Sequence, residues 1–159
     1  MITERILSSL REECGWKPHK LLVIGVSGGA DSLTLAHCLR QAGVNFLAAH
    51  LDHGLRPSSA REAEWVRALF SSWGLPCSIR RVEVGGFARE HKLGLEEAAR
   101  RCRYEFLFQV AEENKAQAVA VGHTADDQVE TILMHFIRGS GINGLRGIQP
   151  RALLTEFHP

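Results

Sequence analysis

One stretch constrains the fold of this chain more than any other. An uninterrupted apolar run over residues 21–26 ends at two adjacent glycines and is followed by an apolar-striped run over residues 33–39. The first run predicts a buried strand, the glycines a tight turn, and the striped run a helix. A strand that turns directly into a helix presents free backbone N–H groups to an anion. We therefore predict a phosphate cradle, formed by Ser27, Gly28, Gly29, Ala30, Asp31 and Ser32.

This cradle lacks the spacing and the lysine of the Gly-x-x-x-x-Gly-Lys-[Ser/Thr] loop, so a nucleotide bound here requires a different chemistry. Its glycines let the backbone approach a phosphate, and Ser27 and Ser32 can donate hydroxyl hydrogen bonds. Asp31 repels a phosphate unless a cation lies between them, so we assign this carboxylate to a Mg²⁺ ion that also contacts the phosphates. The alternative is a well-capped strand–helix turn with no ligand.

The rest of the chain repeats the order of strand and helix. We expect further strands over residues 46–51, 79–84 (ended by Gly85 and Gly86), 118–122 and 152–154. Helical spacing covers residues 2–10, 59–73, 95–114 and 123–137, the last with an inward stripe of Val129, Ile132, Leu133, Phe136 and Ile137. Ser59 and Glu62 form a capping-box signal. The alternation predicts an α/β fold: an open, mostly parallel sheet with helices on both faces, its polar third strand near an edge.

Composition limits the remaining possibilities. With 159 residues and 45% hydrophobic content, the chain fits one globular domain, and its formal net charge of +1 does not indicate a nucleic-acid partner. Four widely spaced cysteines form no Cys-x-x-Cys pair, so we expect reduced thiols rather than a zinc or iron–sulfur site. No apolar run approaches the length of a membrane span and no signal peptide is evident, which makes the cytoplasm the expected compartment.

Ligands of such folds bind beyond the carboxyl ends of the strands. Polar side chains follow the second strand: His50, Asp52, His53 and Arg56. Two histidines three apart also allow a metal site, although no cysteine is near, and His50 can equally pack in the core. After the fourth strand, Asp126, Asp127 and Glu130 have the helical spacing that lets carboxylates converge on an ammonium group or Mg²⁺. Alternatively, the aspartates only complement the dipole of the helix.

Residues 27–32 resemble the Ser-Gly-Gly-x-Asp-Ser signature of the PP-loop ATP pyrophosphatases, which bind the pyrophosphate of ATP and adenylate their substrate. Residues 50–56, 95–100 with 103–104, and 122–131 further resemble one branch of that superfamily, the tRNA(Ile)-lysidine synthases. The resemblance extends over nearly everything from Lys20 to Gly147.

The resemblance implies roles for particular residues. It assigns the cradle and a second group to the ATP pocket, the second group being His50, Asp52, His53, Arg56 and His123. Arg103, before Tyr104, matches a position that approaches ATP or the target base, where its charge would stabilise the phosphates during AMP transfer. Asp127 and Glu130 match the pair that receives lysine, and the catalytic set is Asp31, Arg103, Asp127 and Glu130. We expect Arg100 and Arg101 to be solvated.

The implied reaction uses ATP, Mg²⁺, L-lysine and tRNA(Ile) with a CAU anticodon. ATP adenylates the C2 oxygen of the wobble cytidine, and the ε-amine of lysine then replaces AMP to give lysidine, which changes the codon read from AUG to AUA. We expect residues 1–159 to be a single PP-loop catalytic domain, truncated before the helical tRNA-binding regions of the family. Alone, this domain should bind ATP, bind tRNA poorly and form little lysidine. The oligomeric state stays open, with a homodimer possible. The alternatives are a tRNA cytidine thiolase, expected to carry clustered cysteines, and a nucleotide-binding module without chemistry.

Overall fold

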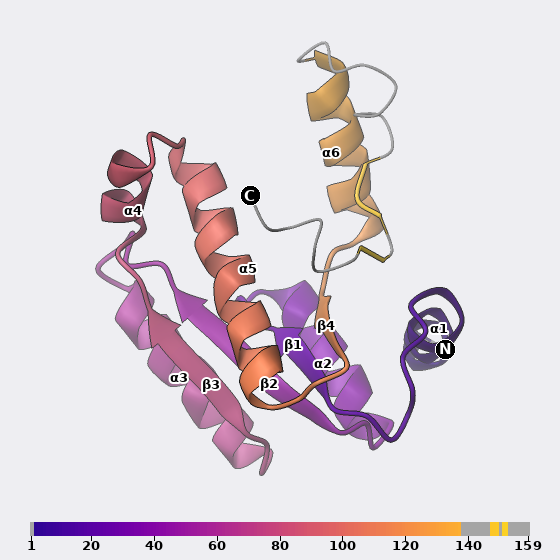
Figure 1. Ribbon diagram of the computed structural model, residues 1–159. Coiled ribbons are helices and arrows are strands. Elements are labelled where there is room, and N and C mark those ends of the chain that lie inside the picture. The colour runs from indigo at the N-terminus through magenta and orange to yellow at the C-terminus, as the bar shows by residue number, and fades with distance from the viewer. Residues whose placement is uncertain (1, 138–146, 150, 153–159) are drawn as a thin grey trace.

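The computed structural model describes residues 2–137, 147–149 and 151–152, which are arranged around a parallel sheet (Figure 1). Its four strands are β1 (Leu22–Gly25), β2 (Phe46–Asp52), β3 (Cys77–Arg81) and β4 (Ala118–Val121), in the order β3-β2-β1-β4. In the register of the sheet, Leu22 of β1 is opposite both Phe46 and Ala118. All the carboxyl ends therefore lie at one edge, and the predicted α/β class and the edge position of β3 are confirmed.

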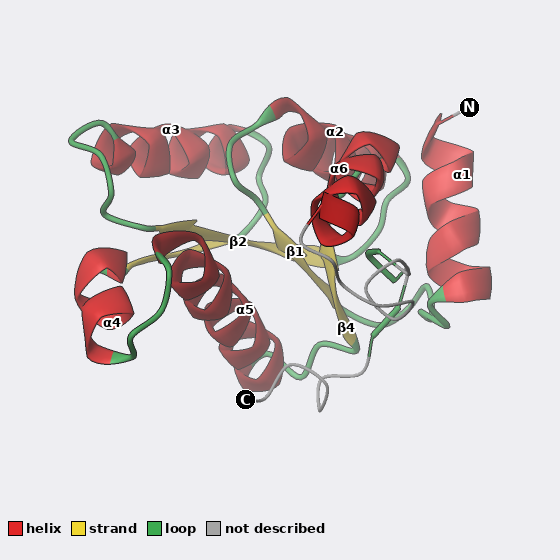
Figure 2. Cartoon of the chain, turned by 90° about the horizontal axis from the view of Figure 1, so that it is seen from above, coloured by secondary structure: helices red, strands yellow, loops and turns green. Residues whose placement is uncertain are grey.

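Helices cover both faces of the sheet (Figure 2). One face carries α2 (Ala30–Gln41) and α3 (Ser59–Ser72), and the other carries α4 (Val84–Glu90) and α5 (Leu95–Glu113). The N-terminal helix α1 (Ile2–Ser8), extended by a π-helical turn over Ser9–Glu13, packs beside α2. The last helix, α6 (Ala125–Ile137), extends past the carboxyl ends of the strands. No helix in these ranges is long and apolar enough to cross a membrane.

The core has two parts, one on each face, because side chains alternate along a strand. Val23 of β1 faces α5, in a cluster with Phe106 and Leu107. Its neighbours Leu22 and Ile24 belong to the opposite cluster, which contains the inner residues of α2 and α3. A strand that is buried on both faces has an uninterrupted apolar sequence, which explains the run that opens the cradle.

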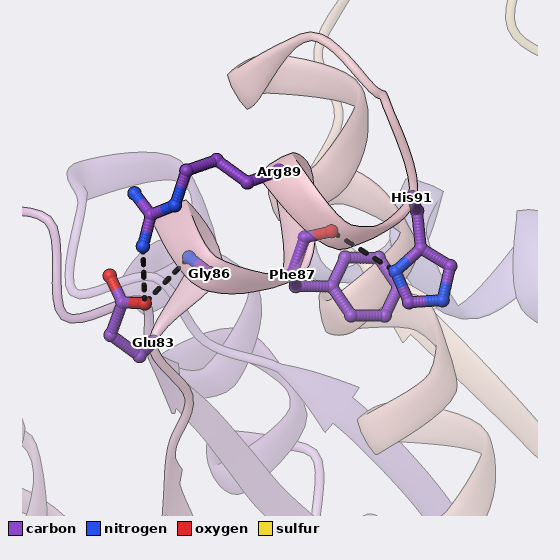
Figure 3. A network of polar contacts seen from close by, with 5 residues as sticks. All are labelled: Glu83, Gly86, Phe87, Arg89 and His91. Carbon is purple, nitrogen blue, oxygen red and sulfur yellow. Dashed lines mark hydrogen bonds and ion pairs between the residues drawn. The ribbon is translucent and has the colours of Figure 1, made fainter.

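The third strand is shorter than predicted. It ends at Arg81, and Val84, expected as its last residue, begins α4 instead. The Glu83 carboxylate accepts a hydrogen bond from the Gly86 N–H at 2.6 Å and lies 3.8 Å from Arg89 (Figure 3). This carboxylate cap satisfies an N–H group that would otherwise be unpaired at the start of the helix. The two glycines predicted to break a strand therefore belong to the first turn of a helix.

The predicted capping box of α3 is also wrong in detail. Ser59 is the first helical residue, and the hydroxyl of the preceding Ser58 donates to the Glu62 carboxylate at 3.0 Å. Gly43 and Gly74, just after α2 and α3, have φ of +66° and +68°. Left-handed backbone is the usual place for glycine after a helix.

The apolar residues of α6 that we predicted to face the core are not buried. No residue of α6 is buried, and Val129, Leu133, Phe136 and Ile137 are 55%, 53%, 70% and 77% exposed. The helix extends beyond the sheet, so its apolar face does not reach the described core. The strand expected over residues 152–154 lies, beyond Ala152, outside the described residues.

Candidate active site

The cradle between β1 and α2 is shaped by its own serines. Gly28 has φ of +89°, a conformation that L side chains rarely adopt. Ser32 Oγ donates to the Gly29 carbonyl at 2.9 Å and accepts from the Ser27 N–H at 3.2 Å. Because the Ser32 proton is already used, the 3.2 Å contact between the two hydroxyls has Ser27 as its donor. The serines therefore fix the loop, and the backbone N–H groups at the start of α2 are the donors best suited to a phosphate.

A cavity of about 610 Å³ runs along the carboxyl edge of the sheet. This volume is typical of a small-molecule site. It brings together these predicted residues: Ser27, Gly29, Asp31, Ser32, His50, Asp52, His53, Arg56, Arg103, His123 and Asp127. Three other predicted residues, Gly28, Ala30 and Glu130, are not among those that line it. Leu107 and Val121 form part of an apolar floor.

Asp52 stabilises the loop after β2. It is 4% exposed, and its Oδ1 accepts the Gly54 N–H at 2.9 Å while its Oδ2 lies 3.7 Å from Arg81 Nε. Burial raises the pKa of this carboxyl, but the nearby Ser59 hydroxyl, the Gly54 N–H and the Arg81 guanidinium outweigh burial and leave the pKa below its ordinary value. Both oxygens are engaged within the protein, so Asp52 shapes the pocket and has little capacity left for a ligand.

His50 is 5% exposed and has a fixed tautomer. Its Nδ1 lies 2.8 Å from the Val26 carbonyl oxygen, which can only accept, so Nδ1 carries the proton. In the neutral ring, Nε2 is then an acceptor at the wall of the cavity. The described residues contain no group of three or more His, Cys, Asp or Glu side chains that could hold a metal ion, which leaves the histidine metal site without support.

Helix α5 contributes a permanent positive charge, Arg103, to the cavity. Arg103 lines the cavity, and its Nε is buried without a partner among the described residues. Of the neighbouring histidines, His53 is partly buried and His123 is exposed. Burial, followed by the charge of Arg103, lowers the pKa of both His53 and His123 below its ordinary value. Near neutral pH these imidazoles stay uncharged, so the guanidiniums of Arg103 and Arg56, which also lines the cavity, are the groups that can meet an anion.

Asp127 is held by the start of its own helix. Its Oδ2 accepts the Thr124 N–H at 2.6 Å and the Thr124 hydroxyl at 3.0 Å, and the Asp127 N–H lies 3.4 Å from the same hydroxyl. These bonds lower the pKa of Asp127 below its ordinary value. It therefore stays ionised and is a weak base, suited to holding an ammonium group rather than to removing its proton. Glu130 is exposed, one turn further along α6.

The sequence argument missed two glycines that bring the site together. A Cβ on Gly122 would lie 3.1 Å from the backbone of Asp31 and from the Cα of Ser32. A Cβ on Gly25 would lie 3.0 Å from both Leu107 and Val121. Both positions require close approach, so the fourth strand end can contact the cradle only through glycine. The sequence did contain a signal for this close approach: each of the two neighbouring strands is ended by a glycine, Gly25 for β1 and Gly122 for β4.

The PP-loop domain family matches residues 2–158, and the chain belongs to this family. Within it, the chain is 42% identical over 155 residues to the tRNA(Ile)-lysidine synthase of Dehalococcoides mccartyi, covering 94% of this chain and 33% of that protein. The enzyme of the same name from Thermus thermophilus is 45% identical over 143 residues, covering 87% and 28%. The chain thus spans about a third of the length of these curated relatives.

Solved structures support the fold. The U34-tRNA thiolase NcsA of Methanococcus maripaludis superposes with a TM-score of 0.73 at 20% identity, covering 89% of this chain and 51% of that one. The NH3-dependent NAD synthetase of Campylobacter jejuni has a TM-score of 0.57 at 16% identity, covering 91% and 75%. At these identities the likeness establishes a shared architecture and no more.

Proposed function

We propose that residues 1–159 are the ATP-using catalytic domain of a tRNA(Ile)-lysidine synthase, with the regions that grip the body of the tRNA outside this segment. One observation carries the proposal: a single cavity joins a phosphate cradle to Arg103 on one wall and Asp127 on another. Such a cavity offers a site for a polyphosphate and a separate anion for an amine. The identity to lysidine synthases over most of the chain supports the same reading.

The first step activates the cytidine. The C2 oxygen of the wobble base attacks the α-phosphate of ATP, the bond between the α- and β-phosphates breaks, and pyrophosphate leaves into the cradle. The N–H groups before α2 hold the departing phosphates, and Arg103 stabilises the charge that develops during the transfer. Adenylation is needed because a carbonyl oxygen is a poor leaving group.

The second step joins lysine to the base. The ε-amine forms a bond to C2, the C2–O bond breaks, and AMP leaves with the oxygen. Asp127 holds the incoming ammonium by charge. Because its pKa is lowered, the proton that the amine must lose goes to another acceptor, such as water or the phosphate of the leaving AMP. Glu130 remains a proposed second anion for lysine, contributing from outside the cavity lining.

Asp31 suits a Mg²⁺ ion. It is exposed at the first turn of α2 and is among the residues that line the cavity beside the cradle, which supports this assignment. Mg²⁺ typically takes one or two carboxylates together with substrate phosphates and water, so a single aspartate is a sufficient protein ligand. When bound, the ion would supply positive charge to the phosphates and remove their repulsion from Asp31.

A tRNA thiolase is the nearest alternative. That reaction calls for cysteines that carry sulfur or a cluster, whereas Cys14, Cys38, Cys77 and Cys102 lie on different segments and none of them lines the cavity. Burial raises the pKa of Cys77 to about 11 and also raises the pKa of Cys102. Little thiolate is then present at neutral pH, which disfavours sulfur transfer by these residues.

The test supplies ATP, lysine and a tRNA(Ile) transcript with cytidine at the wobble position to the full-length protein that contains this domain. We expect ATP–pyrophosphate exchange that needs this tRNA but not lysine, AMP release that needs both, and a lysine adduct detected on the cytidine by mass spectrometry. A transcript with uridine at that position is the matched control, and Asp31→Asn should lower exchange at least about a hundredfold. Exchange that is equal with the uridine transcript would contradict the proposal, as would sulfur incorporation.

A further inference from the structure

Three arginines on α5 have different partners, although they lie within one helical turn. Arg101 Nε pairs with the Glu97 carboxylate at 3.0 Å, in an i,i+4 ion pair. Arg100 and Arg103 have no carboxylate partner among the described residues. Instead, both guanidiniums lie over the ring of Tyr104, at 5.8 Å and 5.3 Å from its centroid. Two cations over one aromatic ring repel each other, and an anion bound near both would offset that repulsion.

The two arginines differ in depth. Arg103 lines the cavity, whereas Arg100 is exposed and does not line it. α5 begins above the carboxyl edge of the sheet and runs down across it (Figure 1), so Arg100, three residues earlier, lies further out by about 4.5 Å along the helix axis. The charge of Arg100 still acts on the cavity, because it contributes, after burial and Arg103, to the lowered pKa of His123. Arg100 thus lies just outside the mouth of the site.

The pair therefore offers one anion site inside the cavity and one outside it. Phosphates of ATP fit the inner site at Arg103. A free nucleotide bound in the cavity has no further phosphate to offer outside. A polynucleotide does, because the nucleotide that enters the cavity has backbone phosphates on both sides. A base can enter such a cavity only when it has left the helical stack, so the matching ligand is single-stranded there.

We propose that Arg100, oriented by the ring of Tyr104, binds a backbone phosphate of single-stranded RNA next to the nucleotide that enters the cavity. This rests on the proposed function, and it assigns a binding role to an arginine that the sequence led us to expect as merely solvated. The formal net charge of the chain is only +1, so one well-placed phosphate contact is a large part of its affinity for RNA.

The experiment compares Arg100→Gln with Arg101→Gln in the full chain. The probe is a fluorescent RNA hairpin whose loop displays CAU, and its binding is measured over a range of salt concentrations. We expect Arg100→Gln to weaken binding about tenfold and to reduce the slope of log affinity against log salt by about 0.7. Arg101→Gln, an equally local loss of charge, should change affinity less than about twofold, because its guanidinium is already paired.

Equal weakening by the two substitutions would overturn the proposal, because a general loss of charge would then explain both. So would a fully paired duplex that binds as tightly as the hairpin, or poly-glutamate that competes as well as RNA, which would point to an acidic protein partner. ATP–pyrophosphate exchange measured with saturating tRNA is a separate readout. Its absence in the unsubstituted chain counts against the proposed function, whereas a selective binding defect in Arg100→Gln supports the phosphate contact independently of catalysis.

Discussion

Helices α5 and α6 both carry apolar residues at helical spacing but are stabilised in different ways. α5 lies across the sheet and buries residues along its length, among them Cys102, Phe106 and Val110. Its N-cap, Gly94, makes no side-chain cap hydrogen bond. α6 buries no residue, and its first turn is held by the reciprocal hydrogen bonds of Thr124 and Asp127.

The contrast separates two sources of helix stability that a sequence pattern does not distinguish. An apolar stripe identifies the face that would be buried, but burial requires another element to lie opposite. For α5 that element is the sheet. For α6 the described helices and strands supply none, and its first turn depends on polar contacts: the capping interactions and the hydrogen bond that the Ile148 N–H donates to Gln128 Oε1. The residues proposed to bind ligand also divide between the two helices, because Arg103 of α5 and Asp127 of α6 both line the cavity.

Truncating the core side of α5 should have the largest effect. Phe106 is 3% exposed and packs in the cluster between α5 and the sheet. We expect Phe106→Ala to lower the free energy of unfolding by about 3–5 kcal/mol, because it removes buried apolar surface and leaves a cavity. Urea denaturation followed by circular dichroism measures this. A loss below about 1 kcal/mol would show that the α5 face is no better packed than that of α6.

The next largest effect should be on catalysis, when the guanidinium of Arg103 on α5 is removed. We expect Arg103→Gln to lower kcat/KM for ATP-dependent modification of tRNA about 10²–10³-fold, as for other groups that stabilise transition-state charge. Removing the guanidinium should also let the pKa of His53 and His123 rise toward 6.5, since its charge helps to lower both. Histidine resonances followed by NMR across pH check this. Unchanged titration would mean that Arg103 does not face these rings.

Much of this architecture could be predicted from the chain alone, and the misses have a common physical cause. The alternation of strands and helices, the turn between β1 and α2 and the α5 stripe follow from local patterns of apolar residues and glycines. The early end of β3 depends on one carboxylate, Glu83, that bonds to the Gly86 N–H, and this outcompetes a continuing strand. The exposure of α6 depends on which element lies opposite, which is a property of the tertiary structure. The close approach at Gly122 depends on strand neighbours far apart in the sequence.

Removing the cap should have a smaller effect, confined to α6. We expect Thr124→Ala to destabilise the first turn by about 1 kcal/mol, which raises amide hydrogen exchange there about fivefold and leaves α5 unchanged. Because the folded-state pKa of Asp127 is lowered, its contribution is present above its ordinary value of 3.8 and is lost as pH falls through the lower folded-state value. Thr124→Ala removes part of this lowering of the Asp127 pKa. On acidification, α6 should therefore lose less stability in the variant than in the unsubstituted protein. Equal acceleration of exchange in α5 would contradict the assignment.

The smallest effect on stability should come from the apolar face of α6. Phe136 is 70% exposed, and the burial of its ring in the described structure is too small for much stability to be lost on truncation. We expect Phe136→Ser to change the free energy of unfolding by less than about 0.5 kcal/mol. Truncation of Phe106 on α5 should lower it by several kcal/mol. The same urea denaturation, run beside Phe106→Ala, gives the comparison directly. A loss above about 2 kcal/mol would mean that this face is covered when the chain is in solution, and that the two helices differ in their partners rather than in their burial.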